Sequence, residues 1–138
     1  MKKVVLDTNT LISALLWDGN GAEIIEKGEK KEIQLFISHE ILEELRGVLK
    51  REKFIKRLES KEYTVEKAVA KIALISTLIE PNIVLDVIKE DPEDNKVLKC
   101  AVSAKAKYII SGDNHLLSLR FYKGIIILTA MDFLKQYK

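Results

Sequence analysis

Two short stretches of this 138-residue sequence decide the fold: residues 4–7 read Val-Val-Leu-Asp, and residues 108–113 read Tyr-Ile-Ile-Ser-Gly-Asp. In each stretch a run of apolar residues is followed closely by an aspartate. A short, wholly apolar run is typical of a strand covered on both faces, as in a parallel sheet. Residues 125–128 have the same character, residues 33–37 form a weaker candidate strand, and residues 83–85 are a further candidate.

Helical patterns lie between these strands. Apolar residues recur at spacings of three and four, and Thr64 stands where an N-cap is favoured. The predicted helices cover residues 9–17, 21–28, 39–50, 65–78, 95–106 and 130–136. Strands that alternate with helices indicate βαβ units, and hence a parallel sheet with helices on both faces. We therefore expect an α/β fold in which residues 1–138 form a single domain.

The composition is that of an ordinary globular protein. A chain of this length buries roughly two-thirds of the surface that its unfolded form exposes, so it needs no disulfide or structural metal. Hydrophobic residues make up 47% and charged residues 32%, which excludes a disordered chain. Apolar runs such as Ile125–Leu128 are too short to cross a membrane, and the lone Cys100 excludes a disulfide framework. We expect a cytoplasmic protein with no membrane partner.

The charges are unevenly distributed, although the net charge is only +2. Residues 45–58 carry six basic side chains against one acid, and residues 84–95 carry five acids against one lysine. So small a net charge does not by itself indicate nucleic-acid binding. On charge alone, two solvated surfaces explain the pattern as well as a binding role does.

Aspartates follow two of the predicted strands. Asp7 comes directly after the first strand, and Asp113 follows the strand at 108–110 after a Ser-Gly pair. In open α/β sheets the ligand site lies beyond the carboxyl ends of the strands, so both aspartates are candidates for a site. The alternative for each is that it is merely the N-cap of the helix that follows.

Helical wheels, drawn at about 100° per residue, select one further acid from each of two helices. Glu44 lies at the border of the apolar stripe of its helix, whereas Glu43 is turned toward solvent. Asp94 lies inside the stripe of its own helix, whereas Glu93 points away. Together with the aspartates at the strand ends, four carboxylates are therefore expected at one edge of the sheet.

Four converging carboxylates need a cation. Like charges about 4 Å apart repel by several kcal/mol at an effective dielectric constant of about 20, and a divalent ion removes that conflict. Ligands that are all oxygen atoms suit Mg²⁺ or Mn²⁺ rather than Zn²⁺. Neighbouring polar side chains are expected to hold the ligands or bound water in place. These are Thr8, Asn9, Ser111 and Asn114.

Three longer stretches resemble a known family, the PIN-domain ribonucleases. VVLDTNTLISALL at residues 4–16 is similar to the opening motif of that family, and ISHEILEELRGVL at residues 37–49 is similar to its second. DPEDNKVLKCAVSAKAKYIISGDNHLL at residues 91–117 is similar to the third and fourth. The resemblance selects the acids Asp7, Glu44, Asp94 and Asp113.

The resemblance implies a fold and a function. The fold is a three-layer α/β/α sandwich around a Rossmann-like parallel sheet. The function is Mg²⁺- or Mn²⁺-dependent cleavage of single-stranded RNA that leaves a 5′-phosphate. The closest subgroup is that of the toxins of prokaryotic toxin–antitoxin pairs, which implies a homodimer and inhibition by a small antitoxin protein.

The resemblance also implies a role for each acid. Glu44 orients a water molecule or holds a second metal ion, so the number of metals stays open. Asp91 and Glu43 remain alternatives to the acids chosen from the wheels. The residues expected to hold the metal are Asp7, Asp94 and Asp113.

The basic side chains of residues 45–58, called the basic segment below, follow Glu44 in the chain. They are therefore placed to contact RNA phosphates beside the site. The expected RNA-binding residues are Arg46, Lys50, Arg51 and Lys53.

Two other functions compete with this hypothesis. A haloacid-dehalogenase-type phosphatase opens with the pattern D-x-D-x-T, whereas residues 7–10 read Asp-Thr-Asn-Thr. Asn9 stands where that chemistry needs a second acid, and an amide does not donate a catalytic proton. A non-catalytic RNA- or protein-binding module is the second alternative.

Substitution of neighbouring acids tests the helix registers. Glu44→Gln and Asp94→Asn keep the side-chain shape but remove a charge that a divalent ion needs, so each variant should lose RNA cleavage by orders of magnitude. Glu43→Gln and Glu93→Gln are the matched controls and should keep activity within a few-fold. The measurement is a cleavage rate on one unstructured RNA. Loss of activity in Glu43→Gln but not in Glu44→Gln would show that the register is wrong.

Overall fold

A six-stranded sheet in the order β3-β2-β1-β4-β6-β5 runs through the computed structural model, which describes residues 1–82 and 93–136. The pairs from β3 to β6 are parallel, and only β5 runs antiparallel to its neighbour β6. The strands are β1 (Lys2–Leu6), β2 (Ile33–Ser38), β3 (Ser76–Ile79), β4 (Tyr108–Ile110), β5 (Phe121–Tyr122) and β6 (Ile125–Leu128).

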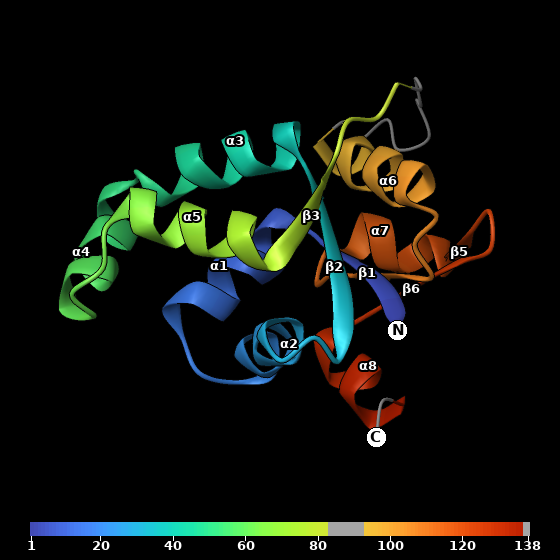
Figure 1. Ribbon diagram of the computed structural model, residues 1–138, viewed down its shortest axis with the longest axis horizontal. Helices are drawn as coiled ribbons and strands as arrows, with labels where there is room; N and C mark the ends of the chain where they lie inside the picture. The colour runs from blue at the N-terminus through green and yellow to red at the C-terminus, as the bar shows by residue number, and fades with distance from the viewer. Residues whose placement is uncertain (83–92, 137–138) are drawn as a thin grey trace.

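Helices cover both faces of this sheet. One layer contains α6, which packs on β1, β2 and β4, and the opposite layer contains α2 and α8 (Figure 1). The helices are α1 (Thr8–Leu16), α2 (Asn20–Glu29), α3 (His39–Leu49), α4 (Glu52–Ser60), α5 (Val65–Ile75), α6 (Glu93–Ala104), α7 (Asn114–Leu119) and α8 (Ala130–Gln136). None of the helices in the described part of the chain has the length and apolar character needed to cross a membrane.

The core is built on the central strand. Val4, Val5 and Leu6 of β1 are at most 3% exposed, because β2 and β4 flank them and helices cover both faces. The side chains of these three residues are buried on both faces of the strand, so a continuous apolar run replaces the alternating pattern of a half-exposed strand. The predicted α/β/α fold with a parallel sheet is confirmed.

The four main predicted strands are confirmed, and one helix prediction is wrong at its end. The helix predicted over residues 65–78 stops at Ile75, and Ser76–Ile79 forms β3 at the edge of the sheet. No glycine or proline marks this boundary, and β-branched residues suit either structure, so pairing with β2 decides it. The candidate strand at 83–85 lies outside the described residues.

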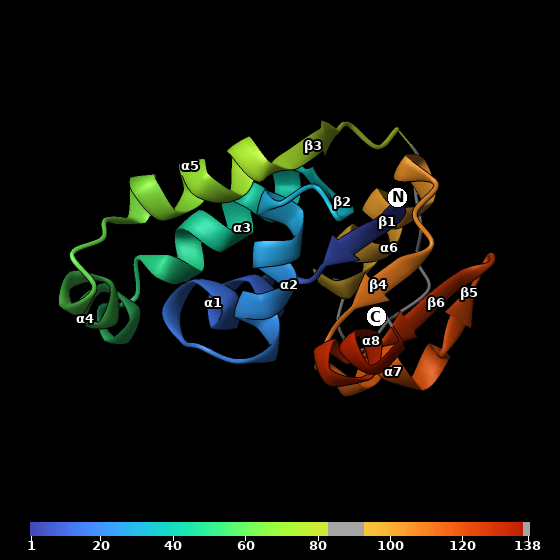
Figure 2. The same cartoon turned by 60° about the horizontal axis from the view of Figure 1, so that its bottom comes forward.

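Three elements were not predicted from the pattern. Most residues of α4 are charged and only Leu58 is buried, so the sequence offers few apolar positions from which to predict this helix. The helix α7 has six residues and β5 has two, too few for a periodic signal. Figure 2 shows α4 at the far end of α3 and α5 from the sheet.

Ser38 links the two helices that carry the predicted acids Glu44 and Asp94. Its hydroxyl accepts a hydrogen bond from the Ile41 N–H at 3.2 Å and so caps α3. The same hydroxyl, 1% exposed, also hydrogen-bonds with the thiol of Cys100 on α6. Burial raises the pKa of the Cys100 thiol to about 12, so this cysteine stays protonated as a small core residue.

Removal of this buried cap should destabilise the fold more than removal of an exposed one. Ser38→Ala leaves the Ile41 N–H buried without a partner and should lower the free energy of unfolding by about 2 kcal/mol. Thr64→Ala removes the exposed cap of α5, whose partner N–H of Lys67 is accessible to water, and should cost about 1 kcal/mol. Urea denaturation measures both values. Equal losses would contradict the special role of the buried site.

Candidate active site

Asp7 lies at the centre of the candidate site, where β1 ends and α1 begins. It is 4% exposed, and its N–H donates to the Ile110 carbonyl of β4 at 3.2 Å. One carboxylate oxygen, Oδ1, accepts from the Thr10 N–H at 2.9 Å and caps α1. The other, Oδ2, accepts a hydrogen bond from the hydroxyl of Ser111. Both oxygens are therefore held, one by a donor from the first turn of α1 and the other by a donor from the end of β4.

Ser111 connects Asp7 to Asp113, the aspartate that follows β4. Its hydroxyl donates to Asp7 and accepts from the Asp113 N–H at 2.9 Å, and the residue is only 1% exposed. Asp113 is half-buried and caps α7 by accepting from the N–H groups of His115 and Leu116 at 2.8 and 3.2 Å. The N-cap alternative thus holds for both aspartates, and it places both at the same edge of the sheet.

Glu44 joins this edge from α3. It is half-buried, and the hydroxyl of Thr8, the residue after Asp7, donates to its Oε1. Glu43 is exposed instead, as the helical wheel predicted. Thr8, the first residue of α1 after its N-cap Asp7, therefore reaches Glu44, because α1 packs against α3.

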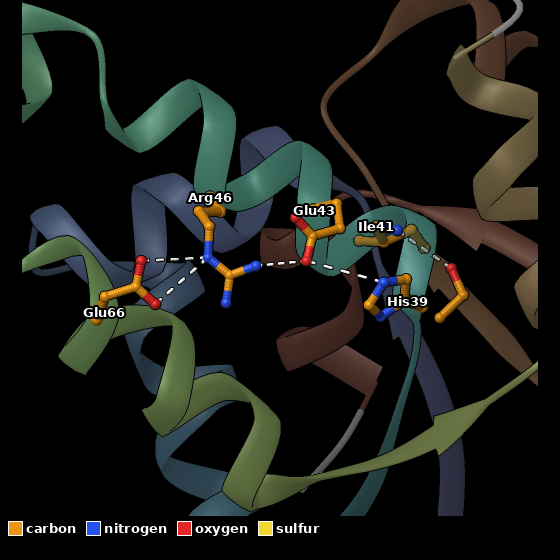
Figure 3. A network of polar contacts seen from close by, with 6 residues as sticks. His39, Ile41, Glu43, Arg46 and Glu66 are labelled. Atoms are coloured by element: carbon orange, nitrogen blue, oxygen red, sulfur yellow. Dashed lines mark hydrogen bonds and ion pairs between the residues drawn. The ribbon is translucent and has the colours of Figure 1, made fainter.

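Glu43 belongs to a separate network on the outer face of α3. It pairs with Arg46, and the Nε2 atom of His39 lies 3.8 Å from its Oε1 (Figure 3). Arg46 also pairs with Glu66 of α5 at 3.2 Å. The guanidinium of Arg46 lowers the pKa of Glu43, so this acid remains a charged surface partner of a cation.

Burial is the main influence on the ionisation of Asp7. Desolvation raises the pKa of this carboxyl above its ordinary value of 3.8, and the hydrogen bonds from Ser111 and Thr10 counteract part of that shift. The charge of Asp113 raises the pKa of Asp7 further. Within the described part of the chain no lysine or arginine forms an ion pair with Asp7.

The fourth predicted acid, Asp94, is the second residue of α6, and its side chain lies outside the described part of the structure. Asp91, the alternative, lies outside the described residues altogether. The next residue of the helix, Asn95, is 6% exposed. Among the side chains that the structure describes, no three His, Cys, Asp or Glu residues gather closely enough to hold a metal ion.

The other predicted site residues differ in their surroundings. Asn9 and Asn114 are exposed, and neither side chain hydrogen-bonds to an acid in residues 1–82 or 95–136. Lys50 and Arg51 are exposed at the turn between α3 and α4, whereas Lys53 lies 4.9 Å from the ring centre of Phe54.

One feature of this edge was missed in the sequence. A groove of about 480 Å³ beside Ser111 has no charged residue among its described lining residues. The side chains of Ser13, Asn20 and Thr129 contribute to it from three separate segments. No local pattern links these positions, so only the folded chain brings them together.

The fold and these contacts define an α/β protein of nuclease type with acids gathered at the carboxyl edge of its sheet. The family model described as PIN domain matches residues 3–115, and the chain belongs to the PIN-domain family. Proteins of this family are generally nucleases, and they generally use divalent metal ions. The assignment to this family, rather than to the haloacid-dehalogenase type, agrees with the amide at Asn9.

The chain is also similar to a protein of an archaeon. The chain is 36% identical over 120 residues to an uncharacterized protein, MJ1680, of Methanocaldococcus jannaschii. The matched region covers 86% of this chain and 75% of that relative.

Removal of the buried charge should stabilise the metal-free protein. The folded-state pKa of Asp7 lies above its unfolded value, so the fold favours the protonated form and loses stability as pH rises from about 3.9 through the folded pKa. Asp7→Asn has no such loss and should melt at a higher temperature than the wild type at pH 7 in EDTA. The difference should shrink as pH falls through about 3.9 and vanish near about pH 2, where the wild-type carboxyl is neutral in both states.

The control for this experiment is Asp18→Asn, in an exposed loop position, which should leave the melting temperature nearly unchanged. A destabilised Asp7→Asn variant at pH 7 would show that the hydrogen bonds to the ionised carboxylate outweigh its desolvation.

Proposed function

We propose that this protein is a metal-dependent endoribonuclease that hydrolyses phosphodiester bonds of single-stranded RNA. The observation that carries the proposal is a set of contacts around Asp7. Thr8, the next residue in the chain, donates to Glu44, and Ser111 donates to Asp7 and accepts from the Asp113 N–H. These contacts gather three acids from β1, β4 and α3 at the edge of the sheet where α/β proteins bind ligands.

The donor set fits Mg²⁺ or Mn²⁺. Asp7 is a buried carboxylate without an ion-pair partner in the described structure, and such a charge is retained only with a compensating cation. Carboxylate oxygens are the ligands that these ions prefer. We assign the metal to Asp7, Asp94 and Asp113, with Glu44 orienting the attacking water. When bound, the metal ion lowers the pKa of a bound water and neutralises charge on the phosphate.

The hydroxyl groups of the chain position the acids. Thr8 and Ser111 each donate to a carboxylate, which holds its oxygens in one orientation before any ligand arrives. Such supporting contacts typically contribute about 10–100-fold to metal affinity or activity. Asn9 and Asn114, both exposed at the first turns of α1 and α7, are placed to contact bound water or substrate.

The finer biological role rests on the resemblance of the motifs to toxins of toxin–antitoxin pairs. We propose that the protein acts as such a toxin, forms a homodimer and is inhibited by a small antitoxin. Family membership supports the nuclease activity that this role requires.

Metal dependence is the direct test of the proposed activity. The protein should cut an unstructured RNA with Mn²⁺ or Mg²⁺ and stop in EDTA, because the acids alone supply neither a nucleophile nor positive charge. Saturation at 100 times the Kd should also stabilise the fold by about 2.7 kcal/mol. Calorimetric titration measures the binding and a melting curve measures the stabilisation. Absence of Mn²⁺ binding to the wild type would leave the non-catalytic binding module as the better description.

The basic segment should bind RNA without taking part in the chemistry. Replacement of Lys50, Arg51 and Lys53 by Ala should raise KM for RNA and leave kcat unchanged, because phosphate contacts add affinity alone. Each lost contact should reduce the slope of log affinity against log salt by about 0.7.

The matched control for the basic segment replaces Lys3, Lys30 and Lys107, which are exposed at the opposite, amino-terminal edge of the sheet. This triple variant should keep both KM and the salt slope. Equal effects of the two triple variants would mean that only net charge matters, and no effect of either would assign the basic segment to a protein contact.

A further inference from the structure

The groove beside Ser111 opens at the same edge of the sheet as the acids. Its volume is about 480 Å³, within the range of about 300–1,000 Å³ typical of small-ligand sites. Ser111 forms part of its wall and donates a hydrogen bond to Asp7, so whatever occupies the groove lies next to the acids. The remaining wall comes from the first turns of α1, α2 and α8 and from the turn after β4. Figure 2 shows these elements around the end of the sheet.

The described lining is polar but uncharged. Side-chain amides come from Asn9 and Asn20, and hydroxyls come from Ser13 and Thr129. Asn9, Ser13 and Asn20 are exposed, and their side chains have no hydrogen-bond partner in the part of the chain that the structure describes. Paired donors and acceptors are thus available to a ligand, without a cation that would select a phosphate.

An apolar surface completes the groove. Met131 at the start of α8 is 51% exposed and lies in the lining. A nucleobase has two flat apolar faces and an edge of donors and acceptors. Thioether and aliphatic surface suits the faces, and asparagine amides read base edges through paired hydrogen bonds. The groove therefore matches a nucleobase better than it matches a sugar phosphate.

We propose that this groove holds one unpaired nucleoside of the RNA strand, next to the phosphate at the acids, and that Asn9 and Asn20 read its base edge. The inference rests on the proposed ribonuclease function, which supplies the position of the phosphate. Base edges are accessible in this way only in unpaired RNA, because bases must be turned out of a helix to enter such a site. The groove would then determine which linkages the enzyme prefers to cut.

A phosphate group is the competing ligand. The N-cap of α2, Gly19, has no side chain to bond the first N–H groups of that helix, so they are free to meet an acceptor. A binding experiment must therefore compare nucleosides with phosphate alone.

The two methionines of the chain provide a built-in probe. Met131 lies in the groove, whereas Met1 is 78% exposed at the opposite end of β1. In protein labelled with ¹³C at the methionine methyl groups, the Met131 signal should shift saturably with at least one of AMP, GMP, CMP and UMP in EDTA. The Met1 signal should not shift with any mononucleotide. Inorganic phosphate should shift neither methionine signal. A Met131→Leu variant assigns the signals.

Filling the groove should abolish this binding. Ser13 is exposed in the middle of α1 with no side-chain hydrogen bond in the described structure, and leucine is a good helix former, so Ser13→Leu should fold. Its affinity for the mononucleotide should fall by at least about 10-fold, which corresponds to about 1.4 kcal/mol. Ser60→Leu, at the end of the distant α4, should bind as the wild type does. In cleavage assays with a random unstructured RNA, Asn20→Ala should flatten the base preference at one position beside the cut.

The outcomes separate this proposal from the proposed function. Cleavage with no shift of Met131 by any mononucleotide would overturn the groove assignment and leave the nuclease intact. A saturable shift that Ser13→Leu abolishes, in a protein that cuts no RNA, would support the groove and overturn the nuclease. An equal shift with inorganic phosphate would overturn the nucleoside assignment and identify an anion site.

Discussion

The candidate site depends on the two hydrogen bonds of the Ser111 hydroxyl. This hydroxyl donates to Asp7 and accepts from the N–H of Asp113, and so joins the ends of β1 and β4. The parallel register that pairs Leu6 with Ile110 makes this possible, because it brings Asp7 and Ser111 to the same height on the sheet. A slip of this register by one residue would turn the site side chains to the opposite face of the sheet.

Each strand-end aspartate serves both the fold and the site. Asp7 caps α1 with Oδ1 while its Oδ2 contacts Ser111, so the cap fixes the orientation in which the second oxygen is presented. Asp113 caps α7 through Oδ1. Capping therefore does not compete with a site role, and it preorganises the carboxylates on rigid elements. The fold bears a cost for this arrangement, because burial opposes the ionised form of Asp7.

The two faces of α3 make different contacts. Its inner face carries Ile41, Leu45 and Leu49 into the core, and Glu44 at the border reaches the hydroxyl of Thr8. Its outer face carries Glu43, which is held by Arg46 in a network that extends to α5. A shift of α3 by one residue would exchange these roles. The buried Ser38 cap at its first turn and the packing of α3 on α1 and α5 fix its rotation.

The sequence by itself predicted the parallel sheet, and it predicted that Asp7 and Asp113 follow strands at one edge of that sheet. Apolar runs such as Val4–Leu6 identify buried strands because covering both faces leaves no polar positions, and an aspartate directly after a strand needs no long-range information to be placed at the sheet edge. The wheel placed Glu44 inward and Glu43 outward because a helix has a fixed period. Only the tertiary structure decided the rest. Edge pairing with β2 ended the predicted helix at Ile75 and placed Ser76–Ile79 in a strand, and packing of α1 on α3 brought Thr8 to Glu44. The neutral groove joins Ser13, Asn20 and Thr129 from three segments, and no local pattern encodes contacts between residues so far apart in the chain.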